Sequence, residues 1–273
     1  MEVTSQTTRS EASTGTADSV YMKDEPLPLI DTTYTISARA KPPETPIFGY
    51  LRAYYGNIPL REIDSLFGFV EQSELYGGRP FRARELSERD VENLNSAGIG
   101  IRLPLTNHFV ERREYENNRP LLDKYHVRGN FVIVTNDDLA KWIRRDFPLY
   151  QIDASVIKNI KTHRKIDQAL TIYDSVVLPM SANEDLELLD KIKEKDRITL
   201  FANAGCALTC PSKLCYPSIS RINKGSEGEV ECSQALKSRQ QLGMVSFKLQ
   251  IFVDLGFHRF KLLRSRPDTM TGH

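Results

Sequence analysis

The feature that most constrains the fold is the alternation of short apolar runs with polar segments of helical character. Parallel strands covered by helices are apolar along most of their length, whereas strands with one wet face alternate apolar and polar residues. Several runs here are almost continuously apolar. The predicted strands are IFGYLRA (47–53), SLFGFVE (65–71), GIGIRLPL (98–105), NFVIVT (130–135), LYQIDAS (149–155), DSVVLP (174–179), RITLFAN (197–203) and FHRFKLL (257–263).

The segments between these runs carry the residues that begin and end helices. In SERDVENLNSAG, Ser87 can cap the first turn and Gly98 can end the helix before the next strand. In SANEDLELLDKIKEKD, Ser181 and Glu184 form a capping-box pattern. Strand and helix in eight alternations predict an α/β protein with a (β/α)8 TIM-type barrel, with an open doubly wound sheet as the alternative.

The first part of the chain is predicted to lie outside the barrel. Residues 1–45 are rich in Ser, Thr and acidic residues without apolar periodicity, so we expect a disordered polar tail. KPPETP (41–46) adds a proline-rich linker with an extended backbone. The barrel is therefore predicted to span residues 46–273, which is long enough for a large core.

Composition and charge exclude some functions. The net charge of +1 gives no strong signal for nucleic-acid binding. No apolar run approaches the roughly 20 residues of a membrane helix, and the N-terminus lacks the apolar region of a signal peptide, so we expect a cytoplasmic protein without membrane insertion. The chain has no Walker A, GxGxxG, GxSxG or HExxH motif, which argues against nucleotide cofactors and the familiar serine and zinc hydrolases.

All four cysteines lie between the last two predicted strands. Cys206, Cys210, Cys215 and Cys232 have the spacing C-x3-C-x4-C-x16-C. Cys206 follows the seventh predicted strand, and barrel enzymes build their active sites at the carboxyl ends of the strands. In a reducing compartment, clustered thiols favour metal binding or chemistry over structural disulfides.

Four thiolates can hold either a tetrahedral zinc ion or a 4Fe–4S cluster. Structural zinc sites usually use C-x2-C knuckles, and neither short gap here is x2. Longer gaps fit a cluster whose irons lie at separate corners, so the spacing favours iron–sulfur over zinc, with unligated or disulfide-forming thiols as a third possibility. The radical-SAM loop, C-x3-C-x2-C, is excluded because the second gap is x4 and the loop follows the seventh strand.

Several stretches together resemble the collagenase-like peptidase U-32 family. They are FANAGCALTCPSKLCY, the downstream Cys232 and FVDLGFHRFKLLRSR, while LFGFVEQSELYGGRP and LYQIDASVI are similar to the family's second and fifth strands. The resemblance covers roughly residues 46–266 and implies a barrel that holds a 4Fe–4S cluster on the four cysteines. Some members are similar to proteins of oxygen-independent ubiquinone or tRNA uridine hydroxylation, and others were named as peptidases.

The chain departs from this family in two places. The first cysteines are spaced differently, and the closing strand continues from Lys261 to Arg264 without the glutamate of the family's Lys-x-Glu-Gly-Arg sequence. Any chemistry of that glutamate is therefore in doubt.

Three further residues are candidate catalytic groups at the barrel mouth. His108 follows the third predicted strand, Asp153 lies at the end of the fifth and Lys261 lies in the last. The plainer interpretations are a loop histidine with a local hydrogen bond and a solvated or anion-binding lysine.

The leading hypothesis is an iron–sulfur protein that modifies a small or RNA-borne substrate by oxygen-independent hydroxylation or a related reaction. The alternatives are a peptidase-like hydrolase and a non-catalytic scaffold with a structural zinc or cluster. A protein partner is compatible with each hypothesis.

Overall fold

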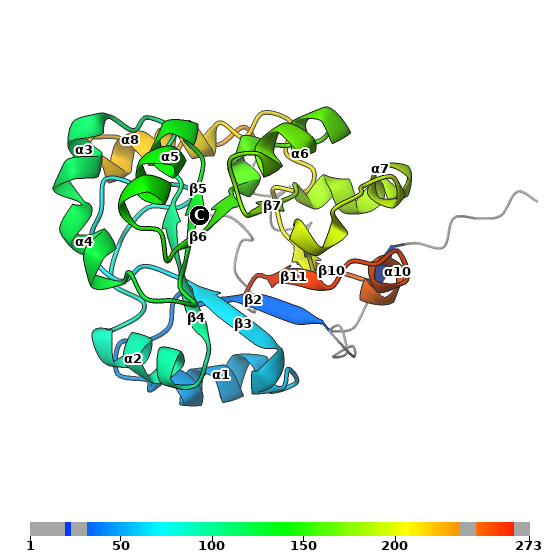
Figure 1. Ribbon diagram of the computed structural model, residues 1–273, viewed down its shortest axis with the longest axis horizontal. Helices are drawn as coiled ribbons and strands as arrows, with labels where there is room; N and C mark the ends of the chain where they lie inside the picture. Colours follow the sequence, from blue (N-terminus) through cyan, green and yellow to red (C-terminus); the bar gives the residue numbers. More distant parts are fainter. Residues whose placement is uncertain (1–19, 23–31, 235–243, 265–273) are drawn as a thin grey trace, which may run out of the picture.

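Eight parallel strands close into a barrel in the computed structural model, which describes residues 20–22, 32–234 and 244–264. The strand order is β11-β2-β3-β4-β5-β6-β7-β8, and β11 closes the ring by pairing with both β2 and β8 (Figure 1). The predicted (β/α)8 barrel is confirmed. The strands are β2 (Thr33–Ser37), β3 (Ile63–Phe67), β4 (Gly100–Leu105), β5 (Phe131–Val134), β6 (Gln151–Ala154), β7 (Ser175–Val177), β8 (Ile198–Phe201) and β11 (Arg259–Leu262).

Helices follow the strands and cover the outside of the barrel (Figure 1). In α5, Leu139, Ala140 and Ile143 are buried as one stripe at helical spacing. The helices are α1 (Ile47–Tyr55), α2 (Glu88–Ser96), α3 (Arg112–Asn117), α4 (Arg119–Lys124), α5 (Asp137–Asp146), α6 (His163–Leu170), α7 (Leu186–Asp190), α8 (Cys215–Asn223) and α10 (Leu249–Asp254). Short 3-10 turns are η1 (Leu60–Glu62), η2 (Val156–Lys158), η3 (Met180–Glu184) and η4 (Lys195–Arg197).

The first barrel strand is not the predicted one. Residues 47–53 belong to α1, and the strand is Thr33–Ser37, which lies inside the segment predicted to be a disordered tail. The barrel therefore begins before residue 46, and residues 1–19 and 23–31 of the predicted tail lie outside the described residues. The sequence TYTIS has no continuous apolar run, because only Tyr34 and Ile36 contribute apolar side chains to the core.

The other predicted strands all overlap barrel strands, whereas the helix caps have mixed outcomes. Ser87 caps α2 and forms a capping box with Asp90, as expected. Ser181 does not cap a helix but lies in η3, and Asp185 caps α7 by accepting from the Leu188 backbone N–H. Helix α7 therefore begins after Asp185 and not after Ser181.

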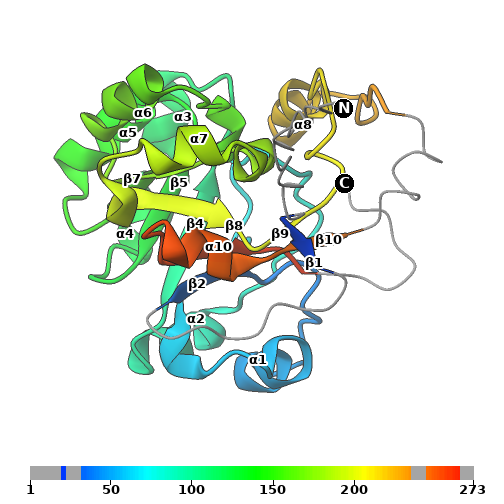
Figure 2. The ribbon, with the colours of Figure 1, turned by 90° about the vertical axis from the view of Figure 1, so that its right-hand side faces the viewer.

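A small antiparallel sheet extends one end of the barrel. It contains β1 (Tyr21–Met22), β10 (Val245–Phe247) and β9 (Asn203–Ala204), in that order. Figure 2 shows these strands together on the same side of the barrel as α8. The chain leaves β8 through β9 and returns through β10, so the cysteine-rich segment is anchored at both ends.

Polar side chains fill the middle of the barrel. Arg102 on β4 forms an ion pair with Asp153 on β6, and since β5 lies between these strands, the contact crosses the barrel interior. Arg102 also bonds Ser65, and Asp153 accepts from Ser175. Barrel interiors are usually filled by branched apolar residues, so this network is unusual.

Within the described ranges, no helix is both long and apolar enough to cross a bilayer.

Candidate functional site

A cavity of about 200 Å³ lies at the carboxyl ends of the barrel strands. Ser37 and Phe67, the last residues of β2 and β3, line it, and so does Leu263 just beyond β11. The cysteine-rich segment forms the opposite part of its wall. This is the end of the fold at which barrel enzymes build their active sites.

All four cysteines line this cavity. They are present as thiols without a disulfide, and Cys232 comes from a part of the chain beyond α8. Cys210 Sγ accepts a hydrogen bond from the Lys213 backbone N–H at 3.3 Å. The structure thus brings together the four cysteines that the sequence pattern indicated.

The thiols influence one another. Burial, followed by the effects of Cys206, Cys210 and Cys232, raises the pKa of Cys215 to about 12. Burial also acts to raise the pKa of Cys210, but hydrogen bonds from Ser233 and from backbone N–H groups outweigh it and hold this pKa below its usual value. Each sulfur is therefore close enough to affect the charge of Cys215.

The donor set fits an iron–sulfur cluster in kind and number, since such clusters are held by four thiolates. Among the residues that the structure describes, no three His, Cys, Asp or Glu side chains are arranged to hold one metal ion. The four thiols share a cavity wall, but they do not converge on a single-ion position.

Helix α8 begins at the cavity wall with Cys215 and Tyr216 and is held by amide side chains. Asn107 Nδ2, after β4, donates to the Ser220 carbonyl at 2.9 Å. Asn223 Nδ2 donates to the carbonyls of Tyr76 and Arg79 at 3.0 and 3.1 Å. These contacts fix α8 to the loops that follow β3 and β4.

His108 does not line the cavity. Its ring Nδ1 lies 3.3 Å from Ser220 Oγ, and its backbone N–H donates to the same hydroxyl. Burial lowers the pKa of His108. The geometry gives this residue a place in the attachment of α8.

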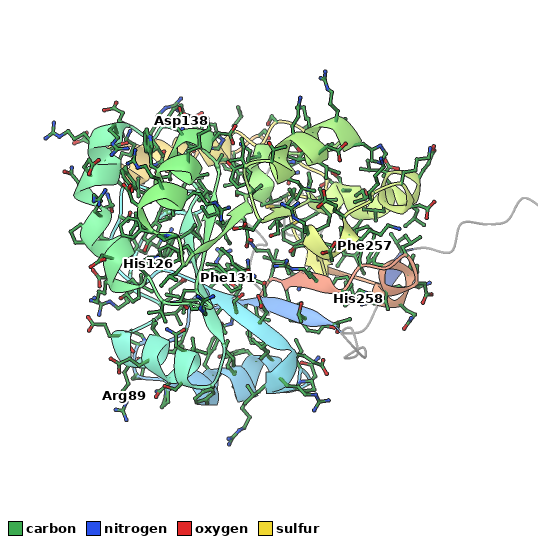
Figure 3. The ribbon with its side chains drawn as sticks, in the orientation of Figure 1. Arg89, His126, Phe131, Asp138, Phe257 and His258 are labelled. Carbon is green, nitrogen blue, oxygen red and sulfur yellow. The ribbon has the colours of Figure 1, made fainter. Side chains whose placement is uncertain are left out.

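Asp153 does not line the cavity either. Its carboxylate pairs with Arg102, which is 2% exposed and lies over the Phe131 ring at 3.7 Å from guanidinium carbon to ring centroid. Phe131 lies near the middle of the molecule, whereas Arg89 lies at its edge (Figure 3). Burial lowers the pKa of Arg102 to about 10 in spite of the opposing effect of Asp64. Asp153 therefore compensates a buried charge beneath the cavity.

Lys261 is the one of these three candidates that reaches the cavity. It is 7% exposed, and its ammonium nitrogen lies 4.2 Å from the Phe67 ring centroid. Burial lowers the pKa of Lys261 to about 7, and the positive charges of Arg102 and Arg79 act in the same direction.

The described lining contains five basic residues and no Asp or Glu. Three of these side chains, Arg39, Arg79 and Lys213, were not singled out in the sequence. Arg79 forms an ion pair with Glu85, and Arg264 Nη1 donates to the carbonyls of Arg39 and Ala40. The basic residues are Arg39, Arg79, Lys213, Lys261 and Arg264.

The two glycines before Arg79 are the sequence feature that indicates an unusual loop at this position. They are Gly77 and Gly78, and an added Cβ at Gly77 would lie 2.3 Å from the Thr106 carbonyl oxygen. The paired glycines therefore allow the loop after β3 to approach the loop after β4.

Comparison with known proteins decides the fold type. No family model and no curated protein matches the chain. The solved structure titled "The Structure of the U32 Peptidase Mk0906" matches with a TM-score of 0.56 and 13% identity, covering 86% of this chain and 93% of that chain. The chain has the fold of a U32 peptidase. At this identity the likeness concerns the fold, which agrees with the resemblance seen in the sequence.

Proposed function

We propose that this chain is a U32-type barrel protein that holds a 4Fe–4S cluster on Cys206, Cys210, Cys215 and Cys232. We further propose that it modifies a small or RNA-borne substrate by oxygen-independent hydroxylation or a related reaction. One observation carries the proposal: four thiols from separate parts of a long insertion line one cavity at the carboxyl end of the barrel.

The chain's own residues would hold the cluster, exclude water and orient the substrate. A bound cluster supplies electron transfer or Lewis acidity. Helix α8, which begins at Cys215, is held to the loops after β3 and β4 through Asn223 and Asn107, which fixes the position of this thiol. The basic wall would offset the negative charge of four thiolates and orient an anionic part of the substrate.

The described residues give less support to a peptidase-like hydrolase. Histidines and carboxylates are the commonest general acids and bases of hydrolases. The described lining contains neither, and Glu71, which follows β3, accepts hydrogen bonds from Lys124 and Tyr125.

Anaerobic purification with iron, sulfide and zinc analysis tests the cluster. We expect about four irons and four sulfides per chain, in keeping with one 4Fe–4S group. Each Cys→Ser variant should lower both contents, whereas Ser212→Ala in the same loop should keep them. A colourless protein with one zinc ion would refute the proposal.

The modification is tested in cells grown without oxygen. Mass spectrometry would compare tRNA nucleosides and quinones from cells with the native protein, with Cys215→Ser and with Ser212→Ala. Loss of a hydroxylated product in the first variant alone would support the redox function. Unchanged products in the cells with Cys215→Ser would favour a non-catalytic scaffold.

A further inference from the structure

Two lysines are buried in the described part of the chain, and their surroundings differ. Lys41 is 3% exposed and forms an ion pair with Asp90 at 3.0 Å. Lys261 is 7% exposed, lies between the Phe67 and Phe201 rings and forms no ion pair with any described carboxylate. A buried amine without an anionic partner favours its neutral form.

Arg79 and Arg102, the cationic neighbours of Lys261, already form ion pairs with the carboxylates beside them. Glu85 binds Arg79, while Asp64 and Asp153 bind Arg102. Both arginines therefore remain as cationic neighbours of Lys261 and favour its neutral form further, in agreement with its pKa of about 7. A neutral lysine amine in a cavity beside a second cation is the usual form of a lysine that attacks carbonyl groups.

The same cavity favours an anionic ligand. Its described lining contains five basic residues and no acidic one. Arg264 Nε, one of these groups, is buried and has no hydrogen-bond partner among the described residues. A carboxylate or phosphate would satisfy such donors.

We propose that Lys261 captures a small aldehyde or ketone that carries a carboxylate or phosphate group, and holds it as an imine. The Nζ lone pair forms a bond to the carbonyl carbon, and one N–H proton passes to the carbonyl oxygen to give a carbinolamine. The carbinolamine then loses water as its C–O bond breaks and the second N–H proton leaves with the hydroxyl group. Amine and carbonyl thus become imine and water without any change in oxidation state, so the step needs no cluster.

Pyridoxal 5′-phosphate, an anionic aldehyde, is the probe, and 5′-deoxypyridoxal, which lacks the phosphate and keeps a free aldehyde, is its match. Each would be added below one equivalent to the full-length protein, reduced with borohydride and located by peptide mass spectrometry. We expect Lys261 to be labelled first and 5′-deoxypyridoxal to label it about tenfold less, a ratio that one ion pair can supply. Lys41 should stay unlabelled because it is buried and its ammonium group is paired with Asp90.

Variants separate the proposal from general lysine reactivity. Lys261→Met should remove the dominant label, whereas Lys141→Met, which removes an exposed lysine of α5 outside the lining, should leave it. Should Lys261→Met fail to fold, the map of the wild-type protein decides alone. Label spread over exposed lysines with none on Lys261, or equal labelling by both aldehydes, would overturn the inference. The cluster content tests the proposed function separately, since the imine forms without it.

Discussion

Replacing Lys261 by Met should stabilise the folded protein at neutral pH, and the gain should shrink as the pH rises. The pKa of Lys261 falls from the ordinary 10.5 to about 7 in the folded state. Between these values the unfolded chain binds a proton that the folded barrel does not, so the free energy of unfolding of the wild type rises with pH. The variant lacks this dependence.

The size of the effect follows from the two pKa values. A tenfold difference in proton affinity corresponds to about 1.36 kcal/mol, so protonation of Lys261 favours the unfolded chain by roughly 4 kcal/mol at about pH 7 and by roughly 2 kcal/mol at about pH 9. The variant's advantage should therefore fall by about 2 kcal/mol between these conditions. Loss of the contact with Phe67 lowers the variant's stability at both pH values, so the difference isolates the titration.

Urea unfolding measures this difference, with the fluorescence of Trp142, the chain's single tryptophan, as the signal. Trp142 packs against Tyr115 at 5.5 Å between ring centroids and reports on the folded helices. Lys41→Met is the matched control: it should destabilise the protein by about 3 kcal/mol because Asp90 loses its buried partner. If the advantage of Lys261→Met were the same at both pH values, a neutral amine in the folded barrel would be refuted.

Three further outcomes are expected. Asp153→Asn should lower the free energy of unfolding by about 3 kcal/mol, because Arg102 keeps its buried charge without this partner; a loss below ~1 kcal/mol in urea unfolding would contradict the ion pair. Gly77→Ala should cost at least ~2 kcal/mol and slow labelling of Lys261, because its Cβ would meet the Thr106 carbonyl at 2.3 Å; unchanged stability and labelling would show that the loops yield freely. Labelling of Lys261 by pyridoxal 5′-phosphate should rise with a midpoint near its pKa of about 7 and then level off, and a rate that still climbs steeply above about pH 9 would show an ordinary lysine.

The sequence by itself predicted the barrel and the cysteine group, because both are written in local patterns. Seven strands are short apolar runs bounded by helix-start residues, and the cysteines lie in one segment after the seventh strand. Neither prediction needed knowledge of distant contacts.

The tertiary structure alone decided the first strand and the role of His108. Thr33–Ser37 becomes a strand because β11 and β3 hydrogen-bond to it on either side, although its sequence carries few apolar residues. His108 meets Ser220, which lies 112 positions away, and no local pattern reports such a pair.

The chemistry of the cavity likewise depended on closure of the barrel. Arg79 follows the second barrel strand along the chain, whereas Lys261 and Arg264 lie in and after the last, and their charges gather only where the parallel strands end together. Burial then lowers the pKa of Lys261. No described carboxylate opposes this effect, because Glu85 and Asp153 are paired with Arg79 and Arg102. The residue types were visible in the sequence, but their neighbours and their solvent exposure were not.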